Sequence, residues 1–295
     1  MKIFVTGATG FVGTAVVQEL LRAGHHVTGL ARSDEAEQKL KTAGVEVHRG
    51  SLEDTDGLRQ AARAADGIIH LGFIHDFSNY AASAEIDRKA ILAMGSELEG
   101  TKKPIVLTSG TLLLQPASGQ LGTEQDHIST HATRHSEAAA DELFQRGVHA
   151  SVVRLAPTVH GEGDHGFIHT LIELARTKGA SAYVGDGSNR WSAVHRLDAA
   201  VLFRKAVEQA AAGSRLHGVD EGSIAFKTIA ETIGRHLNVP VVSIPTEQAA
   251  AHFGWINFAA SADTPISSEL TRQWLDWHPS HQGLLDDLEA GHYFK

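Results

Sequence analysis

The 295-residue sequence contains no cysteine. This absence excludes disulfide bridges, thiolate nucleophiles and cysteine-based zinc or iron–sulfur centres. The sequence also has no run of about 18 apolar residues, the length that a membrane-spanning helix requires, so we expect no membrane partner. Positive charge is not in excess, since 26 lysines and arginines stand against 35 acidic residues. The formal charge of −9 argues against a general surface for nucleic acid or anionic membranes.

Long linkers rich in proline, serine or charge are also missing. The chain is long enough for one large α/β domain or for a domain with an additional lobe. Its hydrophobic fraction of 42% and charged fraction of 21% are ordinary for a globular protein. We therefore expect a compact cytoplasmic protein that binds a small-molecule substrate, and the composition leaves open whether it forms a homo-oligomer.

The chain begins with the segment MKIFVTGATGFVGT, which carries the strongest signal in the sequence. Apolar residues typical of a strand are followed by three glycines, and the next segment, AVVQELLRAG, has helical spacing. The free N–H groups and the dipole at a helix N-terminus attract anions, and glycine permits a close approach of the ligand. A glycine turn without a ligand is the alternative. We predict that a dinucleotide pyrophosphate binds at Gly7, Thr9, Gly10, Phe11, Val12 and Gly13.

The end of the second predicted strand, His26 to Ala31, indicates which dinucleotide binds. This position meets the adenosine ribose in dinucleotide-binding folds, where an acidic residue binds the 2′-hydroxyl and an arginine accommodates a 2′-phosphate. Arg32 and Ser33 follow the strand, so we predict a preference for NADP(H). Asp34 and Glu35 come directly afterwards and keep NAD(H) possible.

The motif TGATGFVG resembles the fingerprint of the short-chain dehydrogenase/reductase superfamily, in particular its extended and atypical, epimerase/dehydratase-like branches. The resemblance implies an α/β fold, a doubly wound parallel (Rossmann) sheet with a smaller C-terminal substrate lobe. It places residues 1–155 in the dinucleotide-binding domain, to which residues 198–220 return, and residues 156–197 and 221–295 in the lobe.

The segment GDGSNRWSAVHRLDAA, residues 185–200, resembles a second signature of the extended branch. The resemblance implies that Val194 and His195 belong to a strand of the lobe. It also implies that Asp198 caps the following helix, because an aspartate at the N-cap satisfies free N–H groups.

Further cofactor contacts are implied by the resemblance alone. Ser51 and Leu52 correspond to residues that lie against the adenine. The segment His70-Leu71-Gly72 corresponds to residues beside the nicotinamide ribose, although a core histidine is the preferred interpretation of His70. The segment Pro157-Thr158-Val159 corresponds to residues that cover the nicotinamide.

Ser109 matches the position of the serine that polarises the substrate carbonyl in this superfamily. It follows the strand segment KKPIVLT, and the carboxyl edge of an open parallel sheet is where such folds bind ligands. A loop serine that caps a turn is the alternative. We predict that Ser109 takes part in catalysis.

The superfamily's Tyr-x-x-x-Lys pair is absent. Alignment puts Thr133 at the tyrosine and Glu137 at the lysine. We leave three alternatives open: a proton from His131 or His135, which the expected helix places on one face; a proton from water or substrate; or cofactor binding without turnover. A fourth alternative is that Tyr183, from another part of the chain, donates the proton.

The histidine pairs of the sequence do not predict a metal site. His131 and His135 stand four residues apart, as do His165 and His169, but no third ligand is visible at a suitable spacing. We expect no metal cofactor.

The sequence thus favours an NADP(H)-dependent reductase that acts on a small carbonyl or imine-like substrate. A non-catalytic NADP(H)-sensing regulatory protein and a sugar-nucleotide epimerase or dehydratase are the alternatives.

Overall fold

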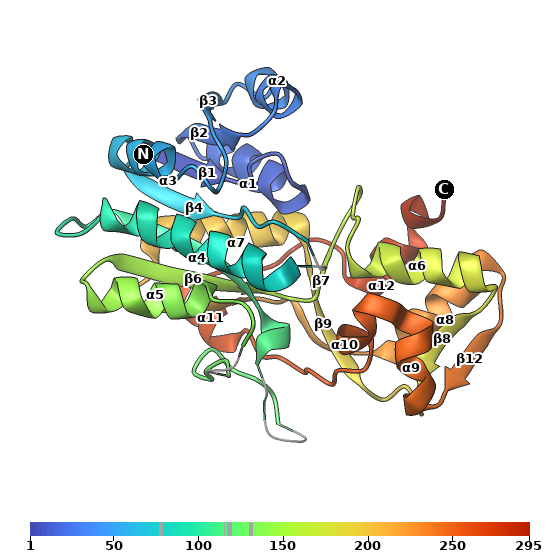
Figure 1. Ribbon diagram of the computed structural model, residues 1–295. Helices are drawn as coiled ribbons and strands as arrows, with labels where there is room; N and C mark the ends of the chain where they lie inside the picture. The colour runs from blue at the N-terminus through green and yellow to red at the C-terminus, as the bar shows by residue number, and fades with distance from the viewer. Residues whose placement is uncertain (77–78, 115, 117–119, 130–131) are drawn as a thin grey trace.

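A seven-stranded parallel sheet forms the centre of the protein in the computed structural model, which describes residues 1–76, 79–114, 116, 120–129 and 132–295 (Figure 1). The strand order is β10-β6-β5-β4-β1-β2-β3. The strands are β1 (Lys2–Thr6), β2 (His26–Ala31), β3 (Glu46–Arg49), β4 (Gly67–His70), β5 (Pro104–Gly110), β6 (His149–Leu155) and β10 (Arg215–Gly218). This order is that of the predicted doubly wound Rossmann fold.

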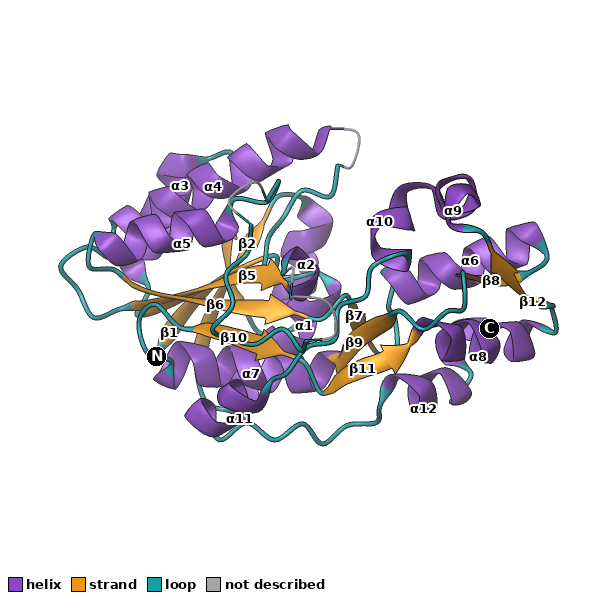
Figure 2. Ribbon diagram, turned by 90° about the horizontal axis from the view of Figure 1, so that it is seen from below, coloured by secondary structure: helices purple, strands orange, loops and turns teal. Residues whose placement is uncertain are grey.

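Helices cover both faces of this sheet (Figure 2). One face packs against α1 (Phe11–Arg22) and α7 (Arg196–Gln209), and the other against α3 (Thr55–Ala64), α4 (Tyr80–Ser96) and α5 (Ser136–Gln145). The remaining helices of this part are α2 (Asp34–Thr42), beside β2 and β3, and α11 (Glu269–Leu275), beside α7 and β10.

The apolar pattern of β1 shows why both faces are covered. Ile3 and Val5 belong to the core cluster on the α1 and α7 side, whereas Phe4 belongs to the cluster on the α3, α4 and α5 side. All three are fully buried. A strand with helices on both faces needs a continuous apolar run rather than an alternating one, and the segment IFV provides it.

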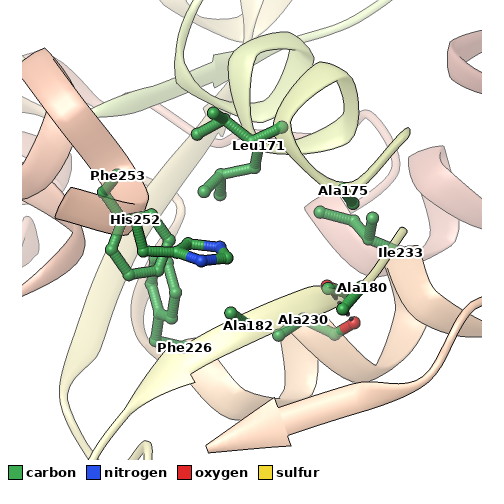
Figure 3. Close-up of a pocket in the computed structure, with 11 residues that line it drawn as sticks. Leu171, Ala175, Ala180, Ala182, Phe226, Ala230, Ile233, His252 and Phe253 are labelled. Carbon is green, nitrogen blue, oxygen red and sulfur yellow. Dashed lines mark hydrogen bonds between the residues drawn. The ribbon is translucent and has the colours of Figure 1, made fainter. Parts of the chain in front are cut away.

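A second, smaller part of the structure has its own core. One three-stranded sheet contains β7 (Thr158–His160), β9 (Arg190–His195) and β11 (Glu221–Ala225), and a two-stranded sheet pairs β8 (Ser181–Val184) with β12 (Val241–Ile244). The helices here are α6 (Phe167–Lys178), α8 (Phe226–Leu237), α9 (Thr246–Phe253), α10 (Asn257–Ala260) and α12 (Leu284–Glu289). Figure 3 shows a small, mainly apolar pocket inside this part, into which His252 and Phe253 point.

The prediction that Asp198 caps α7 is wrong. The helix begins at Arg196, and the His195 side chain accepts the hydrogen bond from the Leu197 backbone N–H at 3.3 Å. The buried Asp198 carboxylate instead accepts hydrogen bonds from the backbone N–H groups of Ser280 and His281, each at 3.0 Å. Asp198 therefore fastens the C-terminal segment to α7, a contact between distant parts of the chain that a local capping rule does not include.

Within the described residues, no helix combines the length and the apolar composition that crossing a membrane requires.

Candidate active site

A large pocket lies at the carboxyl ends of the parallel strands and extends to the smaller part of the structure. Its volume is about 1190 Å³. Sites for single small molecules usually measure about 300–1,000 Å³, so this pocket has room for a dinucleotide together with a substrate. The walls combine residues that follow β1, β2, β3, β4, β5 and β6 with residues of α6 and of the segment near α10.

The glycine turn between β1 and α1 forms one wall. Gly7 has φ +67°, and a Cβ atom there would lie 2.8 Å from the Gly72 backbone nitrogen. A Cβ atom on Gly13 would lie 2.0 Å from the Gly7 carbonyl oxygen. The N-cap residue Gly10 provides no side-chain cap for α1, so the first N–H groups of this helix are available to an anion. The turn therefore fits a dinucleotide pyrophosphate.

Arg32 and Ser33 line the same pocket beyond the end of β2. Arg32 has no carboxylate within ion-pair distance in the described part of the chain, whereas the nearby acids are occupied: Asp34 pairs with Arg49 at 3.0 Å and Glu35 pairs with Lys39 at 2.7 Å. The Ser33 side chain caps α2 by accepting a hydrogen bond from the Ala36 N–H at 3.2 Å. The guanidinium of Arg32 is thus the charge available to an adenosine phosphate.

Six other predicted cofactor residues also line this pocket: Ser51, Leu52, Leu71, Gly72, Pro157 and Val159. His70 and Thr158 do not line it, and each is 2% exposed. His70 binds the Thr6 hydroxyl through Nδ1 at 2.7 Å and Asp87 through Nε2 at 3.0 Å. Its side chain is therefore part of the core, the interpretation that the sequence favoured, and it holds the ends of β1 and β4 in register.

Ser109 lies at the end of β5 and lines the pocket. Its side chain is 3% exposed, and its hydroxyl has no hydrogen-bond partner within the described structure. It approaches the Glu137 carboxylate and contributes to lowering that group's pKa, but the two do not meet the geometry of a hydrogen bond. Ser109 thus lines the pocket at the end of β5, and its hydroxyl oxygen is buried beside the Glu137 carboxylate.

The expected helix carrying His131 and His135 is not formed there. His135 is the N-cap of α5, which begins at Ser136, and residues 132–135 are not helical; His131 lies outside the described residues. The segment is instead held to the sheet by Arg134, whose Nη2 donates to the Thr108 carbonyl oxygen at 3.1 Å. His135 is not among the described residues that line the pocket.

Glu137, at the position of the family's lysine, forms a buried ion pair. Its two oxygens accept hydrogen bonds from Arg154 at 2.8 Å each, and Arg215 donates to one of them at 3.1 Å. Burial by itself would raise the pKa of Glu137, but the Arg154 guanidinium lowers it below its usual value. The acid therefore serves the packing of α5 on β6 and β10.

Three polar side chains that the sequence did not single out also line the pocket: His75, Tyr80 and Arg134. They surround the Phe73 ring, whose centroid lies 5.2 Å from the His75 ring, 5.6 Å from the Tyr80 ring and 4.4 Å from Cζ of Arg134. Burial lowers the pKa of His75, and burial raises the pKa of Tyr80. Of the three tyrosines, Tyr80 lines the pocket, and the other two lie among residues of the lobe.

The sequence pattern gives only a weak indication that these residues line a pocket. HLGFIHDF after β4 could have indicated a ligand-facing loop, because it follows a buried strand at the carboxyl edge of the sheet. No local pattern identified Arg134, since its position depends on the bond to Thr108 of β5.

One cluster of potential metal ligands lies outside this pocket. Ligand atoms of His195, Asp198 and His281 all lie within 4.8 Å of one another. The two imidazole rings, however, are stacked at 4.8 Å with an interplanar angle of 12°, so their in-plane lone pairs do not converge on one point. The Asp198 oxygens accept the hydrogen bonds described above and one from His281 Nδ1 at 2.8 Å. The cluster has the geometry of a hydrogen-bonded contact between β9, α7 and the C-terminal segment.

The parallel sheet, the glycine turn at a helix N-terminus and the pocket at the carboxyl edge define a nicotinamide-dinucleotide-binding Rossmann protein of the short-chain dehydrogenase/reductase type. Residues 7–183 match the family model described as NAD(P)H-binding, and the chain belongs to this family.

Known proteins similar to this chain include an uncharacterised protein, a reductase and a dehydratase. An uncharacterised protein of Schizosaccharomyces pombe is 46% identical over 296 residues, with 100% of each chain covered. A 2-alkyl-3-oxoalkanoate reductase of Stenotrophomonas maltophilia is 29% identical over 233 residues, 74% of this chain and 68% of the reductase. The structure of a dTDP-glucose 4,6-dehydratase of Streptomyces venezuelae has a TM-score of 0.79 at 16% identity, covering 98% and 96% of the two chains. These comparisons support an oxidoreductase-type enzyme, and the predicted protein family and Rossmann fold are confirmed.

Proposed function

We propose that the protein is an NADP(H)-dependent reductase of a small carbonyl or imine-like substrate. The observation that carries this proposal is the position of Ser109, at the end of β5, in the wall of the pocket that also contains the glycine turn. The relative named as an oxoalkanoate reductase supports a carbonyl substrate.

The preference for NADP(H) rests on Arg32. Its guanidinium has no carboxylate partner in the described structure, while Asp34 and Glu35 are engaged by other cations. An arginine presents several N–H donors in a planar fork that matches a phosphate. Arg32 therefore selects the 2′-phosphate of NADP(H), and Ser33 beside it caps the helix that holds the site together.

When bound, the cofactor supplies the hydride. Ser109 donates a hydrogen bond to the substrate oxygen, and this bond strengthens as negative charge develops on that oxygen. Tyr80 is the proton donor in this proposal, because it is the tyrosine on the pocket wall. Burial raises the pKa of its phenol, so the group is protonated at neutral pH but is not activated as an acid.

The second candidate function is cofactor sensing without turnover. The replacement of the family's lysine by Glu137, which is committed to Arg154, favours it. Epimerase and dehydratase chemistry has less support, because the solved structures named for it are similar in fold alone.

The test measures NADPH consumption with a panel of ketones, aldehydes, enones and imines, alongside NADPH binding by its fluorescence. We expect consumption with at least one substrate class, a large loss of turnover in Ser109→Ala, and unchanged NADPH affinity. Ser151→Ala, which removes another buried serine from the neighbouring strand β6, is the matched control. Binding of NADPH without consumption across the panel would favour the sensing function instead.

A further inference from the structure

The substrate end of the pocket contains Arg134, which forms no ion pair with the described residues. Arg134 has no carboxylate within 4 Å in the described part of the chain. Its Nε donates to the Ser136 hydroxyl at 2.9 Å and its Nη2 to the Thr108 carbonyl oxygen at 3.1 Å. Its Nη1 donates to no described protein group. Arginine has five N–H donors and no acceptor, so part of its fork remains available to a ligand.

The bonds that Arg134 does form fix its guanidinium beside the reaction centre. Thr108, whose carbonyl it binds, directly precedes Ser109 in β5. The Phe73 ring lies 4.4 Å from Cζ and further restricts the plane of the guanidinium. Asp87 is near but reaches Arg134 through the Ser136 hydroxyl, because its oxygens accept from His70 and Ser136. The guanidinium of Arg134 is therefore fixed in position, and its remaining N–H donors are available to a ligand in the pocket.

The charged side chains that line the pocket are distributed differently at its two ends. The carboxylates among its described lining residues, Glu35 and Glu53, follow β2 and β3, and the lining lysine, Lys39, is paired with Glu35. The other end contains Arg134 together with the histidines His75 and His165, and burial lowers the pKa of His75. Arg134 is therefore the permanently charged group at this end. The remaining wall there is mainly apolar: Leu112, Leu113, Phe167, Trp255 and Phe258.

We infer that Arg134 forms a carboxylate-binding site in the substrate end of the pocket, and that the substrate is an oxo acid whose carbonyl lies beside Ser109. A guanidinium binds a carboxylate through two parallel N–H donors. A single fixed cation balances the single charge of a carboxylate, whereas a phosphate dianion calls for more positive charge than this end provides. The position of Arg134 next to Ser109 places the carboxylate within a few bonds of the carbonyl, and the apolar wall receives the rest of the substrate.

The identity of the reduced group rests on the proposed function, but the carboxylate site does not. The first experiment therefore uses probes that the enzyme does not reduce. Oxamate and oxamide have nearly the same shape and differ in charge. Their affinities for the protein saturated with NADP⁺, which keeps Arg32 occupied, are measured by calorimetry.

We expect oxamate to bind about 10- to 100-fold more tightly than oxamide, as for a hydrogen bond to a charged group. Arg134→Gln should remove this difference, and Arg134→Lys, which keeps the charge without the fork, should retain part of it. Arg59→Gln is the matched control, because Arg59 is also bound to a carbonyl and a hydroxyl but lies on α3, outside the pocket lining. Equal affinities for the two probes, absence of binding by both, or an unchanged difference in Arg134→Gln would overturn the inference.

The second experiment compares kcat/KM for acetoacetate and its methyl ester. We expect the acid to be preferred, with a loss of about 10- to 100-fold in Arg134→Gln for the acid and little change for the ester. A preference for the ester would overturn the inference. Failure to turn over either compound contradicts reduction of such ketones, and the oxamate comparison still decides on the carboxylate site. Unchanged NADPH affinity in each variant shows that the fold is intact.

Discussion

Replacement of Glu137 by glutamine tests whether this residue has a structural role. Its partner Arg154 is 0% exposed and donates to both Glu137 oxygens at 2.8 Å, while Arg215 donates to one of them. In Glu137→Gln one acceptor becomes an amino group that faces N–H donors, and the buried guanidinium loses its counter-charge. Breaking a buried pair in this way costs about 3–5 kcal/mol of unfolding free energy. For a chain of this size the expected fall in Tm is about 6–15 °C.

Thermal unfolding followed by circular dichroism measures this effect, with Glu142→Gln as the control. Glu142 lies on the same helix but is partly exposed and pairs with Arg88 at the surface at 3.2 Å, so its loss should cost less than about 1 kcal/mol. A Glu137→Gln variant that melts within about 2 °C of the wild type would refute the reasoning. Loss of turnover without loss of stability would assign Glu137 to catalysis instead.

Three further predictions follow from named contacts. Arg32→Ala should weaken NADPH binding by about 10- to 100-fold and change NADH binding little, as fluorescence titration would show; equal losses would refute the phosphate assignment. Tyr80→Phe should lower kcat and remove the pH dependence of the proton transfer, with NADPH affinity unchanged; an identical pH–rate profile would exclude Tyr80 as the donor. Burial and the neighbouring His160 and His281 lower the pKa of His195 from 6.5 to about 4. The unfolded state therefore binds more protons between these pH values, and stability should fall as pH decreases from 6.5 to 4; His195→Gln should show a flatter dependence in denaturant unfolding over this range.

The fold and the grouping of most predicted cofactor residues around one pocket could be predicted from the sequence, because local segments determine them. The glycine turn and the residues after β2 and β3 are fixed by the strand–turn–helix succession, and most of the predicted residues line one pocket. The exceptions, His70 and Thr158, belong to the same segments but have their side chains in the core.

The proposed substrate end of the pocket depends on contacts between distant segments, which the sequence does not predict. The segment before α5 has helical spacing, yet the Arg134 bond to Thr108 holds it outside the helix. Asp198 resembles a capping residue, but the C-terminal segment occupies its carboxylate. Tyr80 enters the pocket because α4 begins at that residue beside Phe73. Each of these outcomes is decided by tertiary packing rather than by local preference.

Hydride transfer in this pocket is the central claim, and isotopic transfer tests it most directly. The protein is incubated with NADPH carrying deuterium at the transferring position and with a panel of oxo acids, ketones and imines, and the products are analysed by mass spectrometry. We expect one deuterium on the reduced carbon of the product, and loss of this label in Ser109→Ala but not in Ser151→Ala. NADPH binding with no deuterium in any product would contradict the reductase function.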